Sequence, residues 1–127
     1  MAIINVLVVV DTKTTLAGTT TVYMEDDNPA VDTGEGSDEL YVKAAPGDEI
    51  IWRAVSVDLA HEINLTQFID ESGSVFQDAP VKNTDGSWSG ITSDAVGNIE
   101  SYTFHFTING EGDYSWDPKI KVKPSGN

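Results

Sequence analysis

Apolar and polar residues alternate at every second position through much of the sequence. In "ESYTFHFTI", the residues that share one side of an extended chain are apolar: Tyr102, Phe104, Phe106 and Ile108. The run "KIKVK" (residues 119–123) repeats this alternation, with its lysines on one side. Successive side chains of a strand point to opposite faces, so a period of two predicts half-buried β-strands and not amphipathic helices.

Turn residues separate these runs at short intervals, which predicts many short strands. Strands are expected near residues 2–11, 19–24, 39–44, 49–57, 62–68, 75–77, 101–108, 112–116 and 119–123. This spacing predicts an all-β fold, a single antiparallel β-sandwich of jelly-roll or immunoglobulin-like type with about eight strands. At most one short helix is expected, within "ITSDAVGNIE", where Ser93 can cap a helical turn. Residues 1–127 are expected to form one domain.

The composition excludes several classes of function. The 127 residues include no cysteine, so the chain can form no disulfide and no thiolate site. Seven basic residues stand against 21 acidic ones, and the net charge of -14 opposes binding to nucleic acid. No run approaches the roughly 20 apolar residues of a membrane helix, so no membrane partner is expected. The N-terminal run lacks a basic region and meets Asp11, which predicts a first strand and no signal peptide, and a cytoplasmic protein.

Two histidines raise the question of a metal site. The segment "PGDEIIWRAVSVDLAHEINL" is similar to the first half of a cupredoxin copper site. A type 1 copper site needs a cysteine thiolate beside two histidines and a methionine, and this chain offers only His61, His105 and Met24. A zinc or type 2 copper site would require both histidines to converge with a carboxylate such as Glu62. The sequence therefore predicts no metal ligands and no cofactor.

No catalytic motif accompanies these histidines, so the chain is expected not to be an enzyme. The sequence contains no GxSxG nucleophile elbow and no HExxH zinc-protease motif. It also lacks the GxxxxGK(S/T) phosphate-binding loop and the GxGxxG dinucleotide-binding motif. The segment "DTGEGSDE" fails as an EF-hand loop, because Gly34 and Gly36 stand where oxygen ligands are needed. A calcium site of another kind, built from loop carboxylates and carbonyls, stays open as an alternative.

Two of the three tryptophans are expected to differ in role. Trp52 is predicted to lie in the core of the sandwich, with its neighbour Arg53 facing outward and paired with a carboxylate. Trp88 lies in the polar loop "KNTDGSWSG" and has two interpretations. It either folds back to cap the sandwich or stays exposed as a platform for a sugar. The second interpretation predicts a carbohydrate-binding, lectin-like loop made of Asn83, Asp85, Ser87 and Trp88.

Three segments follow one another along the chain in this order: "INVLVVVDT", "GSDELYVKAAPGDEIIWR" and "YSWDPKIKV". Together they resemble the inclusion body protein family that includes AidA and PixA. The resemblance implies a small bacterial β protein that is made abundantly and sometimes stored in cytoplasmic inclusions, with no established enzymatic activity. It carries no catalytic residues over to this chain. With two methionines, the chain departs from the methionine-rich members of the family.

Opposite charges in two parts of the chain suggest how copies could associate into a homo-oligomer. One strand face gathers three of the seven basic residues: Lys119, Lys121 and Lys123. The acidic segment from Glu25 to Glu39 offers the complementary charge on another copy. The alternative interpretation is that lysines on an edge strand prevent the addition of further strands.

We expect replacement of all three lysines by glutamine to lower self-association without unfolding the chain. Association should grow as the pH approaches the isoelectric region near 4.1, because protonation of carboxylates reduces repulsion between copies. At about 1 M salt, where the Debye length is roughly 3 Å, the contact between the patches should weaken. Light scattering and sedimentation check this; identical profiles for the variant and the wild type would contradict the lysine contact.

Overall fold

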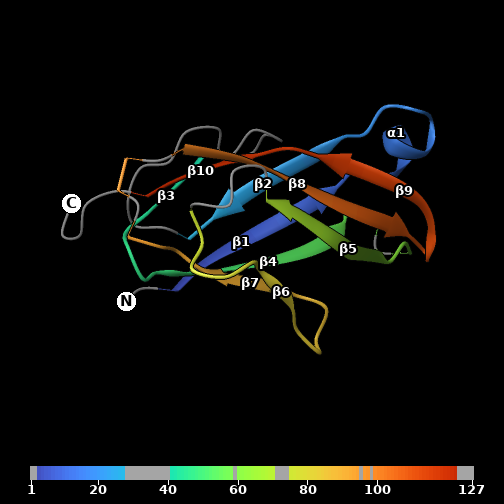
Figure 1. Ribbon diagram of the computed structural model, residues 1–127. Coiled ribbons are helices and arrows are strands. Elements are labelled where there is room, and N and C mark those ends of the chain that lie inside the picture. Colours follow the sequence, from blue (N-terminus) through green and yellow to red (C-terminus); the bar gives the residue numbers. More distant parts are fainter. Residues whose placement is uncertain are drawn as a thin grey trace.

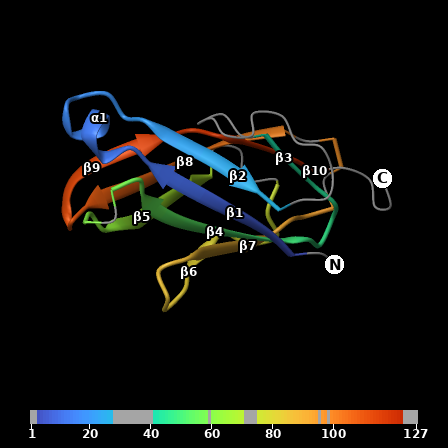
Figure 2. The ribbon, with the colours of Figure 1, turned by 180° about the vertical axis from the view of Figure 1, so that it is seen from behind.

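The chain forms a β-rich fold built around one hydrophobic core (Figure 1, and from behind in Figure 2). The structure, a computed structural model, describes residues 3–27, 41–58, 60–70, 75–94, 96–97 and 99–122. The elements of this part are β1 (Ile3–Val10), α1 (Thr12–Leu16), β2 (Val22–Asp26), β3 (Tyr41–Ala44), β4 (Glu49–Ser56), β5 (Ile63–Asp70), β6 (Val81–Lys82), β7 (Trp88–Ile91), β8 (Ile99–Ile108), β9 (Glu111–Trp116) and β10 (Lys119–Val122).

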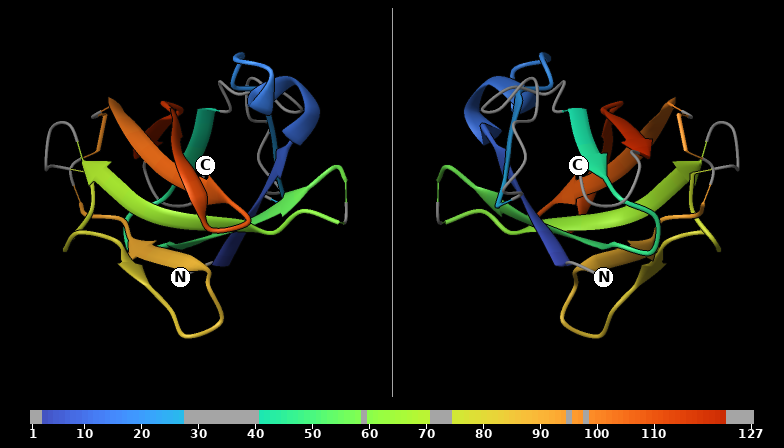
Figure 3. Two further views of the ribbon diagram at one scale, coloured as in Figure 1. Left: turned by 90° about the vertical axis from the view of Figure 1, so that its right-hand side faces the viewer. Right: turned by 90° about the vertical axis from the view of Figure 1, so that its left-hand side faces the viewer.

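The strands form two hydrogen-bonded groups (Figure 3). The first sheet has the order β2-β1-β4-β7-β6. The second has the order β3-β10-β8-β5, and β9 also pairs with β8. The inward side chains of both groups belong to one hydrophobic cluster, as the alternation of buried and exposed residues in β1 illustrates. The all-β class predicted from the sequence is confirmed.

The predicted antiparallel sandwich of about eight strands is wrong in two respects. Strand β1 runs parallel to β4, and β10 runs parallel to β3. Neither pair is adjacent in the chain, so no tight turn dictates an antiparallel arrangement. The described part also contains ten strands. The sequence prediction missed the short β6 and β7, and at the predicted strand 75–77 only an isolated bridge from Phe76 to Thr92 is present. The strand order does not confirm a jelly-roll or immunoglobulin-like topology.

The helix also lies elsewhere than predicted. Asp11 caps α1, with Oδ1 accepting a hydrogen bond from Thr14 N at 3.3 Å. The predicted helical turn after Ser93 is not formed in the described residues 91–94, 96–97 and 99–100, where Gly97 has a φ of +90°. Among the described residues, no helix is long and apolar enough to span a membrane.

Trp52 lies at the centre of the core, as predicted, with 0% of its surface exposed. Its indole Nε1 donates a hydrogen bond to Tyr102 Oη at 3.2 Å, which satisfies the one polar group that the ring brings into the interior. Burial raises the pKa of Tyr102, so its hydroxyl stays protonated. The apolar face predicted for β8 is confirmed, since all four of its side chains are buried: Tyr102, Phe104, Phe106 and Ile108.

A glycine permits close packing at the inner face of β7. A Cβ atom added at Gly90 would lie 2.9 Å from Phe76 Cδ1 and 2.9 Å from Pro80 Cγ. We expect Gly90→Ala to lower the free energy of unfolding by about 1–3 kcal/mol, the usual cost of overpacking. Urea denaturation followed by circular dichroism measures this. The control, Ser89→Ala on the outward side of the same strand, should cost less than about 1 kcal/mol. If Gly90→Ala had the same free energy of unfolding as the wild type, the side chains of Phe76 and Pro80 would be able to move aside without loss of stability.

Candidate functional site

The hairpin between β6 and β7 brings together three of the predicted loop residues. Ser87 donates to Asp85 Oδ1 twice, from Oγ at 2.6 Å and from its backbone N at 3.0 Å. Asn83 Nδ2 donates to Ser87 Oγ at 3.1 Å. The hydrogen bonds from Ser87 hold the pKa of the Asp85 carboxyl below its ordinary value, and the nearby Arg53 guanidinium adds to this effect. The loop is therefore fixed by its own polar contacts.

Trp88 does not extend from this loop as an open platform. Its side chain is half-buried, and its ring packs edge to face against Phe104, with the centroids 6.0 Å apart. Its indole Nε1 donates to the backbone oxygen of Leu65 at 3.0 Å. Of the two interpretations of Trp88, the geometry matches the one in which the ring folds back against the strands. A role for the loop residues in binding a ligand stays a prediction.

A cleft of about 340 Å³ opens beside the hairpin. Its walls come from β4, from the start of β5 and from the hairpin loop: Arg53, Ala54, Val55, Glu62, Ile63, Asn64, Leu65, Asp85, Gly86 and Ser87. Arg53 donates from Nη1 to Asn5 Oδ1 at 3.2 Å, and its Nη2 lies 3.7 Å from Asp85 Oδ2. The predicted pairing of Arg53 with a carboxylate is thus present. We call this hollow the Arg53 cleft.

The sequence prediction missed the residues that β4 and β5 contribute to the Arg53 cleft. Lys82 Nζ donates to Asn64 Oδ1 at 2.6 Å, which connects the hairpin to β5. Arg53 could be placed on the outer face from the alternation along its strand. Nothing in the sequence indicated that β5 would lie beside the hairpin. The two segments do not pair as strands, since β5 pairs with β8 and β6 pairs with β7.

Arg53 also borders a second hollow, of about 320 Å³, on the first sheet. Its lining comes from β1, β2 and β4: Asn5, Val6, Leu7, Glu25, Asp26, Asp27 and Arg53. Asn5 donates to Asp27 from its backbone N at 2.7 Å and from Nδ2 at 2.9 Å. These hydrogen bonds from Asn5 hold the pKa of Asp27 below its ordinary value. Apolar and charged groups therefore meet on this face.

The lysines of β10 do not lie on an edge strand. Strand β10 runs between β3 and β8, so the interpretation in which they guard an open edge is wrong. Lys121 is half-buried on this interior strand. The side chain of Lys119, the whole of Lys123 and residues 28–40 of the acidic segment lie outside the described part of the chain. The lysine contact between copies stays a prediction.

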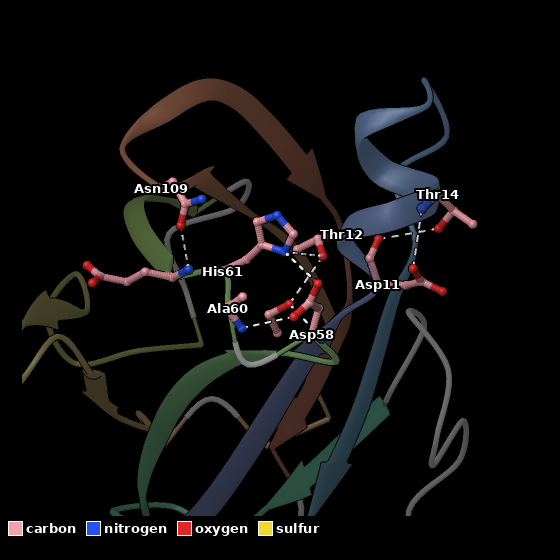
Figure 4. A network of polar contacts seen from close by, with 9 residues as sticks. Asp11, Thr12, Thr14, Asp58, Ala60, His61 and Asn109 are labelled. Carbon is pink, nitrogen blue, oxygen red and sulfur yellow. Dashed lines mark hydrogen bonds and ion pairs between the residues drawn. The ribbon is translucent and has the colours of Figure 1, made fainter.

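His61 belongs to a polar network where β1, α1 and β4 meet (Figure 4). Its Nδ1 lies 3.0 Å from Thr12 Oγ1 and 3.4 Å from Asp58 Oδ2. Thr12 Oγ1 lies 3.3 Å from Ser56 Oγ, and both hydroxyl residues are buried. In a catalytic triad the nucleophile and the carboxylate contact different ring nitrogens, whereas here both contact Nδ1. The network thus fastens the β4–β5 turn to the start of α1.

The two histidines do not converge. His105 Nδ1 lies 2.8 Å from Asp113 Oδ1 on the neighbouring β9. His105 pairs across the sheet with Gln67 in β5, whereas His61 precedes the start of that strand and is six residues away from Gln67 along the chain. Met24 is buried, and its sulfur accepts a hydrogen bond from Trp116 Nε1 at 3.1 Å. Within the described residues, no three His, Asp or Glu side chains are grouped to hold a metal ion.

Comparison with known proteins identifies related sequences and folds. A protein-family model described as "Domain of unknown function (DUF8788)" matches residues 2–114. No curated protein matches the chain. Among solved structures, the inclusion body protein PixA from Burkholderia cenocepacia J2315 is similar, with a TM-score of 0.79 and 16% sequence identity over 95% of each chain. At this identity the likeness shows a shared fold, which agrees with the resemblance found in the sequence.

We expect Ser87→Ala to raise the pKa of Asp85 toward its ordinary value of 3.8, because the carboxylate loses its strongest hydrogen-bond donor. Since the pKa is lowered in the folded state, this contact stabilises the fold above the ordinary pKa and is lost as the pH falls through the folded value. Carbon-detected NMR titration measures the shift. Asp27 is the internal control, since its partner Asn5 is unchanged. An unaltered Asp85 titration would contradict the assignment.

Proposed function

The chain belongs to the family described as a domain of unknown function (DUF8788), and from this premise we propose that it is a non-enzymatic, self-associating bacterial protein of the inclusion-body type. The observation that carries this proposal is the fold likeness to an inclusion body protein, which extends over 95% of both chains. The three sequence segments that resemble the AidA and PixA family point in the same direction. Abundant storage in the cytoplasm is part of the proposal.

The charge of the chain suggests how such association is regulated. A net charge of -14 makes copies repel one another at neutral pH and low salt. Salt screens this repulsion, and acid removes part of it by protonating carboxylates. Contacts between apolar surfaces of two copies are then favoured, because the electrostatic repulsion that opposes them is smaller. Reversible assembly that depends on pH and salt is therefore the property that we assign to the protein.

Sedimentation velocity of the full chain tests this assignment. We expect the sedimentation coefficient to rise with protein concentration at pH 7 and about 0.15 M salt, where the Debye length is about 8 Å. We expect a further rise as the pH falls toward the isoelectric region near 4.1. The rise should reverse on return to pH 7. A monomer at every concentration, pH and salt would contradict the proposal, as would association only as an irreversible precipitate.

A second candidate function is binding of a carbohydrate, in a lectin-like manner and with calcium as an optional aid. The Arg53 cleft favours this candidate, because it places a guanidinium, a carboxylate and an amide around one hollow. Such groups match the hydroxyls of a sugar. Trp88 takes part only as a support beneath the hairpin, through its hydrogen bond to Leu65.

A glycan array, probed with and without calcium, tests the second candidate. We expect any glycan bound in the Arg53 cleft to lose affinity in the variant Asp85→Ala. The matched control is Asp113→Ala, an exposed carboxylate on β9 that does not line the cleft. Equal loss in both variants, or no bound glycan under either condition, would contradict binding at this cleft. Binding only with calcium would assign the ion to the site.

A further inference from the structure

The outward face of β2, β1 and β4 carries an unusual row of apolar side chains. In the register of the sheet, Val9 of β1 lies between Tyr23 of β2 and Val55 of β4. Tyr23 and Val55 are each 42% exposed, and Leu7, the next outward residue on β1, is 44% exposed. A sheet face toward solvent normally carries polar side chains, because only the opposite face packs on the core. An exposed apolar cluster of this kind is typical of a contact surface.

Charges of opposite sign flank the centre of this cluster. Leu7 lies directly between Glu25 on β2 and Arg53 on β4. Neighbouring strands are about 4.8 Å apart, so the backbone positions of these two residues stand roughly 10 Å apart, on either side of Leu7. We call these six residues the outer patch: Leu7, Val9, Tyr23, Glu25, Arg53 and Val55.

The order of these residues is self-complementary. A two-fold axis parallel to β1 that passes over Leu7 exchanges the β2 side with the β4 side. Glu25 of one copy then lies over Arg53 of the other, and the same contact forms a second time. Leu7 meets Leu7 of the second copy at the centre. A two-fold axis perpendicular to the strands would instead place Glu25 over Glu25, which is repulsive.

The apolar row obeys the same symmetry. Rotation about the axis parallel to β1 places Val55 of one copy over Tyr23 of the other and Val9 over Val9. The hollow of about 320 Å³ beside Leu7 leaves room for side chains of the second copy. The charged row thus selects this arrangement, and the apolar row fits it as well. From this agreement we propose that the outer patch is the interface of a face-to-face dimer of this chain.

This dimer rests on the proposed function, for which it names the first step of self-association. Two identical patches close on each other, so the contact by itself produces pairs and not filaments. Larger assemblies then need a second contact on the paired unit. Arg53 keeps its hydrogen bond to Asn5 on its own chain and lies 3.7 Å from Asp85, so its guanidinium is held between these two residues at the border of the patch.

Two charge-reversing variants test the dimer. Sedimentation velocity at pH 7 and about 0.15 M salt should show that Glu25→Arg alone and Arg53→Glu alone each associate at least about tenfold more weakly than the wild type. Each single variant places like charges in both symmetric contacts. An equimolar mixture of the two restores both attractive contacts, so we expect the mixture to dimerise about as tightly as the wild type.

Net charge cannot produce this pattern. Glu25→Arg removes one negative and adds one positive charge, which takes the net charge of -14 to about -12 and reduces the general repulsion between copies. A nonspecific charge effect would therefore strengthen association of this variant. Glu111→Arg, an exposed position on β9, gives the same net charge and is the matched control. It should associate at least as tightly as the wild type.

A substitution at the centre of the patch gives an independent measurement. Leu7→Lys places two lysines over each other on the axis and should leave the chain monomeric. Ile69→Lys is its control, an exposed apolar residue on the other sheet, 36% exposed against 44% for Leu7. Circular dichroism checks that each variant is folded, and if Arg53→Glu is not, the pair Leu7→Lys and Ile69→Lys decides the matter.

The outcomes separate the dimer from the proposed function. If the wild type never associates, the proposed function fails and the dimer with it. If the wild type associates while the single variants associate equally well, or their mixture stays monomeric, the outer patch is not the interface and the proposed function stands. Equal loss in Leu7→Lys and Ile69→Lys would also overturn the dimer.

Discussion

The packing of Trp52 against the second sheet is the interaction on which the rest of the structure depends. The centroid of its ring lies 5.3 to 5.9 Å from the centroids of four other aromatic rings, those of Phe68, Phe76, Tyr102 and Phe104. These rings come from β5, from the bridge before β6 and from β8, so a single side chain of β4 contacts segments far apart in the sequence. The hydrogen bond from its indole to Tyr102 fixes the orientation of the ring.

The position of Trp52 also decides what the outer face presents. Because side chains alternate along a strand, burial of Trp52 turns Arg53 outward. The parallel register with β1 then sets Arg53 beside Leu7, and the antiparallel register of β2 sets Glu25 on the other side. Arg53, the sequence neighbour of Trp52, borders both hollows and thereby connects the Arg53 cleft with the outer patch.

The ends of the strands are held by polar contacts of a different kind. Thr12, Ser56 and His61 come from three separate segments and meet through their side chains, where the backbone leaves the sheet. Burial of hydroxyl groups is tolerated there because each has a hydrogen-bond partner. The same polar groups could have suggested a reactive centre. Their geometry instead explains why α1 stays attached to the turn between β4 and β5.

The sequence by itself determined the β class and the burial of Trp52 and of the apolar face of β8, since alternation depends only on neighbouring residues. It also placed Asn83, Asp85 and Ser87 in one loop, because a short hairpin keeps near neighbours together. The cap of α1 was present in the sequence as Asp11 but was overlooked beside the stronger strand pattern.

Only the tertiary structure decided which strands are neighbours. The parallel pairing of β1 with β4, the interior place of β10 and the position of β5 beside the hairpin all join distant segments, and no local pattern encodes such pairings. For the same reason the half-buried state of Trp88 and the alignment of Glu25, Leu7 and Arg53 could not be derived from the sequence. Both follow from packing and register, which exist only once the sheets have formed.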